Sequence, residues 1–147
     1  MTVERVVLDA AGLDEIAANR ALRALLRRTV ERGGQVWCAA VTIAEVARGP
    51  ARTARVHHVL VRQFGGRRVL VQVTDERVAL LVGALLHDSG RGSEDLADAH
   101  VVATCAPAAV ALVVTTDPDD ITDIGGHLPG VRIRCVRPDR LETSRAT

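Results

Sequence analysis

The chain has 147 residues, 48% hydrophobic and 25% charged, which fits one globular domain. All 19 of its basic side chains are arginine, and it has one Trp, one Phe and no Tyr. The lack of lysine excludes P-loop phosphate binding, Schiff-base catalysis and the lysine-assisted aspartate chemistry of receiver domains and haloacid-dehalogenase-like phosphatases. The scarcity of aromatic residues argues against binding bases by stacking on a sheet, and a net charge of +1 attracts nucleic acid only weakly.

The sequence shows no membrane or export signal. Its longest apolar run, 106–114, is far shorter than the about 20 residues a membrane helix needs. Arg5 is followed by only three apolar residues before Asp9, so no signal-peptide core is present. The three cysteines are widely spaced and form no C-x-x-C pair, as expected for buried thiols. We therefore expect a soluble, cytoplasmic protein.

Short apolar runs, typical of buried strands, alternate along the chain with amphipathic runs, typical of helices. The predicted strands are 3–8, 35–39, 69–73, 111–115 and 131–136. Helices are predicted at 19–32, 42–48, 51–64, from 74 to beyond 85, at 93–105 and after 117. Strands separated by helices form parallel βαβ units, so we predict an α/β fold. It should be a three-layer α/β/α sandwich with a parallel sheet of about five strands, one domain over 1–137 and a polar, frayed tail over 138–147.

Acidic residues follow these strands or lie on the next helix, where a parallel sheet binds its ligands. They are Asp9, Glu45, Asp95, Asp98, Asp117 and Asp120. Asp9 ends the first strand and Asp117 follows the fourth, while Asp95 and Asp98 share one helix face. Such a set of carboxylates, without clustered His or Cys, suits Mg²⁺ or Mn²⁺.

Helix capping is an alternative explanation for several of these acids. Asp9 is placed to cap the turn that follows it, Asp117 before Pro118 suits a helix start, and Asp95 suits a first helical turn. Capping does not explain Glu45 and Asp98. Both lie in apolar stretches, where a carboxylate is expected to be buried and to need a partner.

Four segments carrying these acids resemble the PIN domain, the nuclease fold of VapC-type toxins in bacterial toxin–antitoxin pairs. They are VVLDA at 6–10, VTIAEV at 41–46, DLADAHVVA at 95–103 and VVTTDPDD at 113–120. Their order and spacing match the family over about residues 3–137. The resemblance implies a metal-dependent endoribonuclease whose products carry 5′-phosphate and 3′-hydroxyl ends.

The roles of individual residues follow from the same resemblance. It implies that Asp9, Glu45, Asp98 and Asp117 are catalytic and hold one or two Mg²⁺ or Mn²⁺ ions, and that Asp120 is a further metal ligand. Thr115 matches a small polar residue that often contacts the first acid, and Asp95 is a supporting residue. The chain departs from the family at Ala11-Gly12, where a Ser or Thr is common. If that hydroxyl positions metal or phosphate, the affinity is expected to be lower here.

Arginines around the predicted helix at 51–64 are candidates for contacting RNA. Arg48, Arg52 and Arg55 are proposed to bind phosphates, which arginine contacts bidentately, and a solvated helix face is the alternative. The resemblance further implies a homodimer silenced by a cognate VapB-type antitoxin. Two other functions stay open: a PIN nuclease that processes RNA outside a toxin–antitoxin pair, and a non-catalytic protein-binding module.

Overall fold

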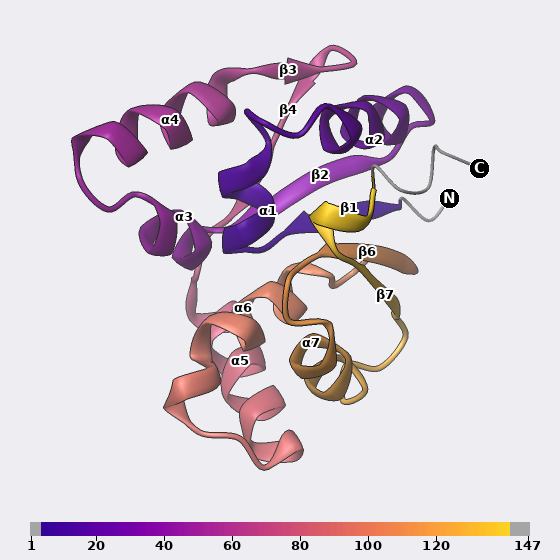
Figure 1. Ribbon diagram of the computed structural model, residues 1–147. Coiled ribbons are helices and arrows are strands. Elements are labelled where there is room, and N and C mark those ends of the chain that lie inside the picture. The colour runs from indigo at the N-terminus through magenta and orange to yellow at the C-terminus, as the bar shows by residue number, and fades with distance from the viewer. Residues whose placement is uncertain (1–3, 142–147) are drawn as a thin grey trace.

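The computed structural model describes residues 4–141, so position 3 of the first predicted strand and residues 142–147 of the predicted tail lie outside it. A five-stranded parallel sheet forms the middle of the molecule, with strand order β5-β2-β1-β6-β7 (Figure 1). The strands are β1 (Arg5–Leu8), β2 (Gln35–Ala39), β5 (Leu70–Gln72), β6 (Val110–Val114) and β7 (Arg132–Val136).

Helices cover both faces of this sheet. They are α1 (Ala10–Glu15), α2 (Arg20–Glu31), α3 (Ala40–Val46), α4 (Pro50–Val61), α5 (Glu76–Ser89), α6 (Leu96–Thr104) and α7 (Pro118–Gly125). Single 3₁₀ turns lie at η1 (Ser93–Asp95) and η2 (Pro138–Arg140). The predicted three-layer α/β/α sandwich with a parallel sheet is confirmed.

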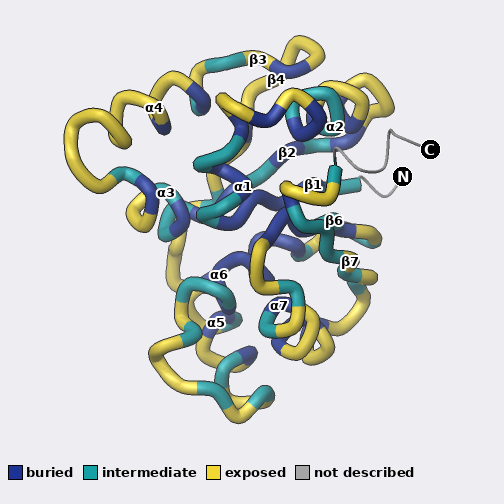
Figure 2. The backbone as a smooth tube through the Cα atoms, viewed as in Figure 1, coloured by how far each residue is buried: buried dark blue, intermediate teal, exposed yellow. Residues whose placement is uncertain are grey.

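Alternation along the central strands builds two hydrophobic cores. Val6 and Leu8 of β1 pack with residues of α1, α2, α3 and α4, whereas Val7 packs with residues of α5, α6 and α7. Because successive side chains of a strand point to opposite faces, one strand serves both cores. Figure 2 shows the result: the central strands are buried and the outer sides of the helices are exposed.

The order of the strands creates a crevice between β1 and β6. The chain runs from β1 outward through β2 to β5, then returns across the sheet to place β6 beside β1 and β7 beyond it. At such a reversal the loops that follow the two neighbouring strands diverge, which leaves a ligand site at their carboxyl ends. Asp9 and Asp117 follow β1 and β6, so the topology brings them to this crevice.

Two short elements were not predicted. Helix α1 has six residues, too few to show a hydrophobic period, and it begins directly after Asp9. The predicted helix at 51–64 ends at Val61, and a small antiparallel hairpin follows, with β3 (Gln63–Phe64) and β4 (Arg67–Arg68). Gly65 and Gly66 form its turn at φ of 58° and 89°, a conformation that glycine adopts without strain.

The start of the predicted frayed tail is packed. Pro138 is buried, its carbonyl accepts a hydrogen bond from Asn19 Nδ2 at 3.0 Å, and Leu141 packs against the core beneath α1 to α4. The prediction of fraying is therefore wrong for 138–141, because an apolar side chain and a buried carbonyl hold this segment down. Within residues 4–141, no helix has the length and apolar character needed to cross a membrane.

Candidate functional site

Asp9 lies at the carboxyl end of β1, and its side chain is 8% exposed. Its Oδ1 accepts a hydrogen bond from the Gly12 N–H at 2.9 Å, so Asp9 does cap α1. Burial raises the pKa of Asp9, while hydrogen bonds from the Thr115 side chain and from backbone N–H groups, that of Gly12 first, counteract the rise. The capping hydrogen bond thus holds the Asp9 carboxylate in place. From there its charge raises the pKa values of Asp98 and Glu45.

Thr115 joins the ends of β1 and β6. It is fully buried, its side chain hydrogen-bonds Asp9, and its Oγ1 accepts the Asp117 N–H at 2.9 Å. Asp117 stands at the start of α7, but its side chain makes no capping hydrogen bond. Capping therefore does not account for the Asp117 side chain, which is exposed.

Asp98 is the electrostatic centre of the acidic residues. It lies half-buried on the first turn of α6. Burial raises the pKa of Asp98 to about 6, and the charges of Asp120, Asp117, Asp95 and Asp9 add to the rise in that order. Acids from β1, α6, α7 and the loops between them therefore repel one another at one place, and a cation there would relieve the repulsion.

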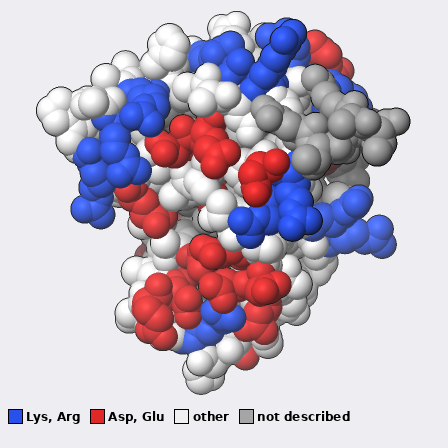
Figure 3. Space-filling view, viewed as in Figure 1, with Lys and Arg blue, Asp and Glu red and all other residues white. Residues whose placement is uncertain are grey.

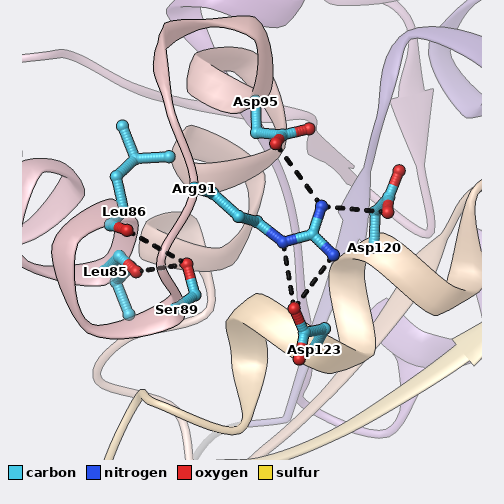
Figure 4. Close-up of polar contacts among 7 residues, drawn as sticks. All are labelled: Leu85, Leu86, Ser89, Arg91, Asp95, Asp120 and Asp123. Carbon is cyan, nitrogen blue, oxygen red and sulfur yellow. Dashed lines mark hydrogen bonds and ion pairs between the residues drawn. The ribbon is translucent and has the colours of Figure 1, made fainter.

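Three of these side chains form a tight group. Carboxylate oxygens of Asp95, Asp98 and Asp120 lie within 4.8 Å of one another. Asp95, expected only to support the site, is thus placed as closely as a metal ligand would be. Arg91 contacts two members of this group, Asp95 and Asp120 (Figure 4): its Nη1 lies 3.0 Å from Asp120 Oδ1 and 3.4 Å from Asp95 Oδ2.

Glu45 differs from the sequence-based expectation. It lies on α3 in an apolar stretch, yet the residue is exposed, so the prediction of a buried side chain is wrong. The reason is helical geometry: the neighbouring Thr42 and Val46 take the buried face and turn Glu45 outward. Partial burial and the charge of Asp9 raise the pKa of Glu45, and Arg48 opposes the rise. Glu45 therefore lies within electrostatic reach of Asp9.

The donor set fits Mg²⁺ or Mn²⁺. All of its side chains are carboxylates, three of them within 4.8 Å, and such hard oxygen ligands are those that both ions prefer. His100, which lies two residues after Asp98, is buried with Nδ1 2.8 Å from the Leu96 carbonyl, so it faces its own helix. The repulsion at Asp98 and the oxygen-only donors together match a divalent-cation site.

The three candidate RNA-binding arginines lie on α4 or just before it. Arg48 Nε donates to the Ala44 carbonyl at 3.0 Å, and Arg55 pairs with Asp14 at 3.2 Å. Arg52 is exposed on the first turn of α4. Figure 3 shows arginines gathered over α3 and α4 and acidic residues gathered over α6 and α7 on the same face of the molecule. The chain therefore presents a basic and an acidic surface side by side.

Arg91 and Asp123 were not predicted as site residues. Arg91 lies in the loop after α5, and Asp123 one turn after Asp120 on α7. One signal was present in the sequence, since Arg91 precedes Asp95 by four residues, the spacing of a helical ion pair. Its contacts with Asp120 and Asp123 depend on how α7 packs, and no local pattern predicts them.

Together, fold and site define a three-layer α/β protein with a carboxylate cluster at the switch point of its sheet. The chain belongs to the PIN domain family, a family of nucleases, whose pattern matches residues 6–126. Among solved structures, it is similar to a chain of the one described as "Structure of FitAB bound to IR36 DNA fragment", with a TM-score of 0.59 and 21% identity. The match covers 90% of this chain and 94% of that one, and at this identity it shows the fold alone. No curated protein matches the sequence.

The pKa of Asp98 predicts a pH-dependent affinity for metal. Protons compete with a cation for this carboxylate below a pKa of about 6. At about pH 5, competition at Asp98 alone should weaken Mn²⁺ binding about tenfold relative to about pH 7.5. Thermal unfolding with and without Mn²⁺ at several pH values checks this. A stabilisation by Mn²⁺ that is equal across this range would contradict it.

Proposed function

We propose that this chain is a metal-dependent endoribonuclease toxin that hydrolyses RNA phosphodiester bonds in the cytoplasm. The observation that supports this most is that acids from segments far apart in the sequence converge on Asp98. The charges of Asp120, Asp117, Asp95 and Asp9 all raise the pKa of Asp98, so five carboxylates interact electrostatically at the switch point. Membership of the PIN domain family adds to the proposal, because three of the four segments that resemble VapC-type toxins carry these five acids and the fourth carries Glu45.

The proposed site assigns a task to each acid. Asp9, Asp98 and Asp117 would hold the divalent cation, with Asp120 beside them. When bound, Mg²⁺ or Mn²⁺ would lower the pKa of a coordinated water and neutralise negative charge on the phosphate. Glu45, exposed on α3 and within electrostatic reach of Asp9, would be a further ligand of the cation.

RNA contact is proposed for the basic surface over α4, and Arg52 offers the cleanest test. Its side chain is exposed, whereas Arg48 and Arg55 have partners within the protein. We expect Arg52→Ala to weaken RNA binding two- to tenfold and to lower the salt dependence by about one phosphate contact. Arg132→Ala, at the opposite end of the sheet, is the control. Equal losses in both variants, measured by RNA titration at several salt concentrations, would contradict a specific contact.

The partners are proposed from the resemblance to VapC-type toxins. They are a homodimer partner and a cognate VapB-type antitoxin that covers the acidic crevice. Two other functions remain open as alternatives, a PIN nuclease of RNA processing and a non-catalytic binding module. A short antitoxin-like reading frame directly upstream distinguishes the toxin from the processing nuclease. Calorimetric titration with Mn²⁺ distinguishes both nucleases from the module, because caps alone bind no metal tightly.

The decisive experiment combines expression with mapping of RNA ends. The chain is induced with and without the neighbouring gene, and new 5′ ends are mapped. Purified chain is then incubated with RNA, with Mn²⁺ or with a chelator. We expect growth arrest without the neighbouring gene, new 5′-phosphate ends, and cleavage only with metal. Normal growth together with unchanged RNA ends would overturn the proposal.

A further inference from the structure

Arg91 is held by carboxylates from two different parts of the chain. It lies in the loop after α5, where Gly90 adopts a left-handed conformation at φ 70°. Its Nη1 contacts Asp120 and Asp95, while Nε and Nη2 contact Asp123 Oδ2 at 3.0 and 2.9 Å (Figure 4). Three carboxylates thus hold the guanidinium beside α7. A side chain that only solubilised the loop would not need three acidic partners.

The position of this guanidinium matters because two of its partners belong to the tight acidic group. Asp95 and Asp120, with Asp98, bring carboxylate oxygens within 4.8 Å of one another. Asp98 is the member that Arg91 does not contact among the ion pairs of residues 4–141. Arg91 therefore already places a positive charge against Asp95 and Asp120. Asp98, which lies within electrostatic reach of Asp117 and Asp9, has no such partner among the ion pairs of the described residues.

A second divalent ion would meet this charge at close range. Two-metal sites place their ions about 3.5–4 Å apart, each shared between carboxylates. An ion that contacted both Asp95 and Asp120 would have to displace Arg91 Nη1, which lies 3.4 Å from Asp95 and 3.0 Å from Asp120, or lie against it. Repulsion between like charges at such a distance opposes that arrangement.

We propose that Arg91 acts as a built-in cation that occupies the Asp95–Asp120 side of the cluster and limits the chain to one divalent ion. That ion is held on the other side, by Asp98 with Asp9 and Asp117. The inference rests on the proposed metal-dependent function and adds the number of ions to it. The inference also changes the role of Asp120. Its main role is to anchor Arg91, and its contact with the metal is secondary.

The test is the stoichiometry of Mn²⁺ binding, measured by calorimetry and by the electron paramagnetic resonance of free Mn²⁺. The wild-type chain is expected to bind one ion. Arg91→Gln removes the charge and is expected to bind two ions. Its affinity for the second Mn²⁺ should be at least tenfold higher than any affinity of the wild type for a second Mn²⁺. Arg91→Lys keeps the charge and should bind one. Arg32→Gln, which removes the exposed Arg32–Glu4 pair, is the matched control and should also bind one.

Stability supplies a second measurement on the same variants. Without metal, Arg91→Gln should unfold at a lower temperature than Arg91→Lys, because Asp95, Asp98 and Asp120 then repel one another unopposed. Mn²⁺ should restore more of the lost stability in Arg91→Gln than it adds to the wild type. A glutamine variant that stays unfolded even in Mn²⁺ would overturn the inference, since a second ion ought to replace the missing charge.

The outcomes separate this inference from the function on which it rests. If the wild type and Arg91→Gln both bind one ion with equal affinity, Arg91 does not limit the site, and the proposed nuclease stands. Two ions in the wild type overturn the inference in the same way. If none of the four proteins binds Mn²⁺, the inference and the proposed metal-dependent function fail together.

Discussion

Replacing Asp98 with asparagine is expected to abolish metal-dependent cleavage and, at the same time, to stabilise the metal-free protein. The lost carboxylate is the one that all the neighbouring acids repel, so it is the natural ligand of a cation. We expect RNA cleavage in Mn²⁺ to fall more than about 100-fold, as when a metal site loses a ligand or its support.

The gain in stability follows from the sign of the pKa shift. The pKa of Asp98 rises from 3.8 to about 6 on folding, so above about pH 6 the folded protein carries a charge that costs free energy. As the pH falls from about 6 toward 4, protonation relieves this cost; asparagine relieves it at every pH. After allowance for partial exposure, the free energy of unfolding at neutral pH should rise by about 1 kcal/mol.

Urea denaturation in a chelator, beside an RNA cleavage assay, measures both effects of Asp98→Asn. Asp88→Asn is the matched control, because Asp88 is exposed on α5 and lies outside the acidic group. Its change in unfolding free energy should stay within about 0.5 kcal/mol, and its cleavage should be unchanged. An Asp98→Asn protein that cleaves RNA normally, or that is destabilised without metal, would show that Asp98 is a structural residue.

Much of the fold was predictable because it depends on local patterns. A continuous apolar run such as Val6, Val7 and Leu8 marks a strand that is buried on both faces, and strands separated by helices imply a parallel sheet. The elements that escaped prediction are short. Helix α1 depends on a cap and one buried turn, and the β3–β4 hairpin depends on two glycines whose conformation the sequence permits without requiring.

The site was predictable where it depends on strand ends and not where it depends on packing. Asp9 and Asp117 follow neighbouring strands, so topology alone brings them together. Glu45 was placed correctly on its helix but on the wrong face, because an apolar neighbourhood in sequence does not fix the direction of one side chain. The contact of Arg91 with α7 joins residues 29 and 32 positions apart, which only the packed structure brings together.

Two substitutions of Asp9 should separate its structural role as a helix cap from its proposed role in catalysis. Asparagine caps helices about as well as aspartate and keeps an oxygen that accepts the Gly12 N–H. It also removes a buried charge, whose cost raises the pKa of Asp9. We therefore expect Asp9→Asn to keep the fold, with a change in unfolding free energy below about 1 kcal/mol, and to lose cleavage more than about 100-fold.

Asp9→Ala should lose cleavage to the same extent and stability as well. Alanine leaves the Gly12 N–H without its partner and the Thr115 hydroxyl without a carboxylate, which should cost about 1–2 kcal/mol more than asparagine does. Denaturation curves and Mn²⁺-dependent cleavage of the two variants, measured side by side, test both statements. Full activity of Asp9→Asn in Mn²⁺ would mean that Asp9 serves only as the cap of α1, and the carboxylate cluster would then have to function without the acid at the end of its first strand.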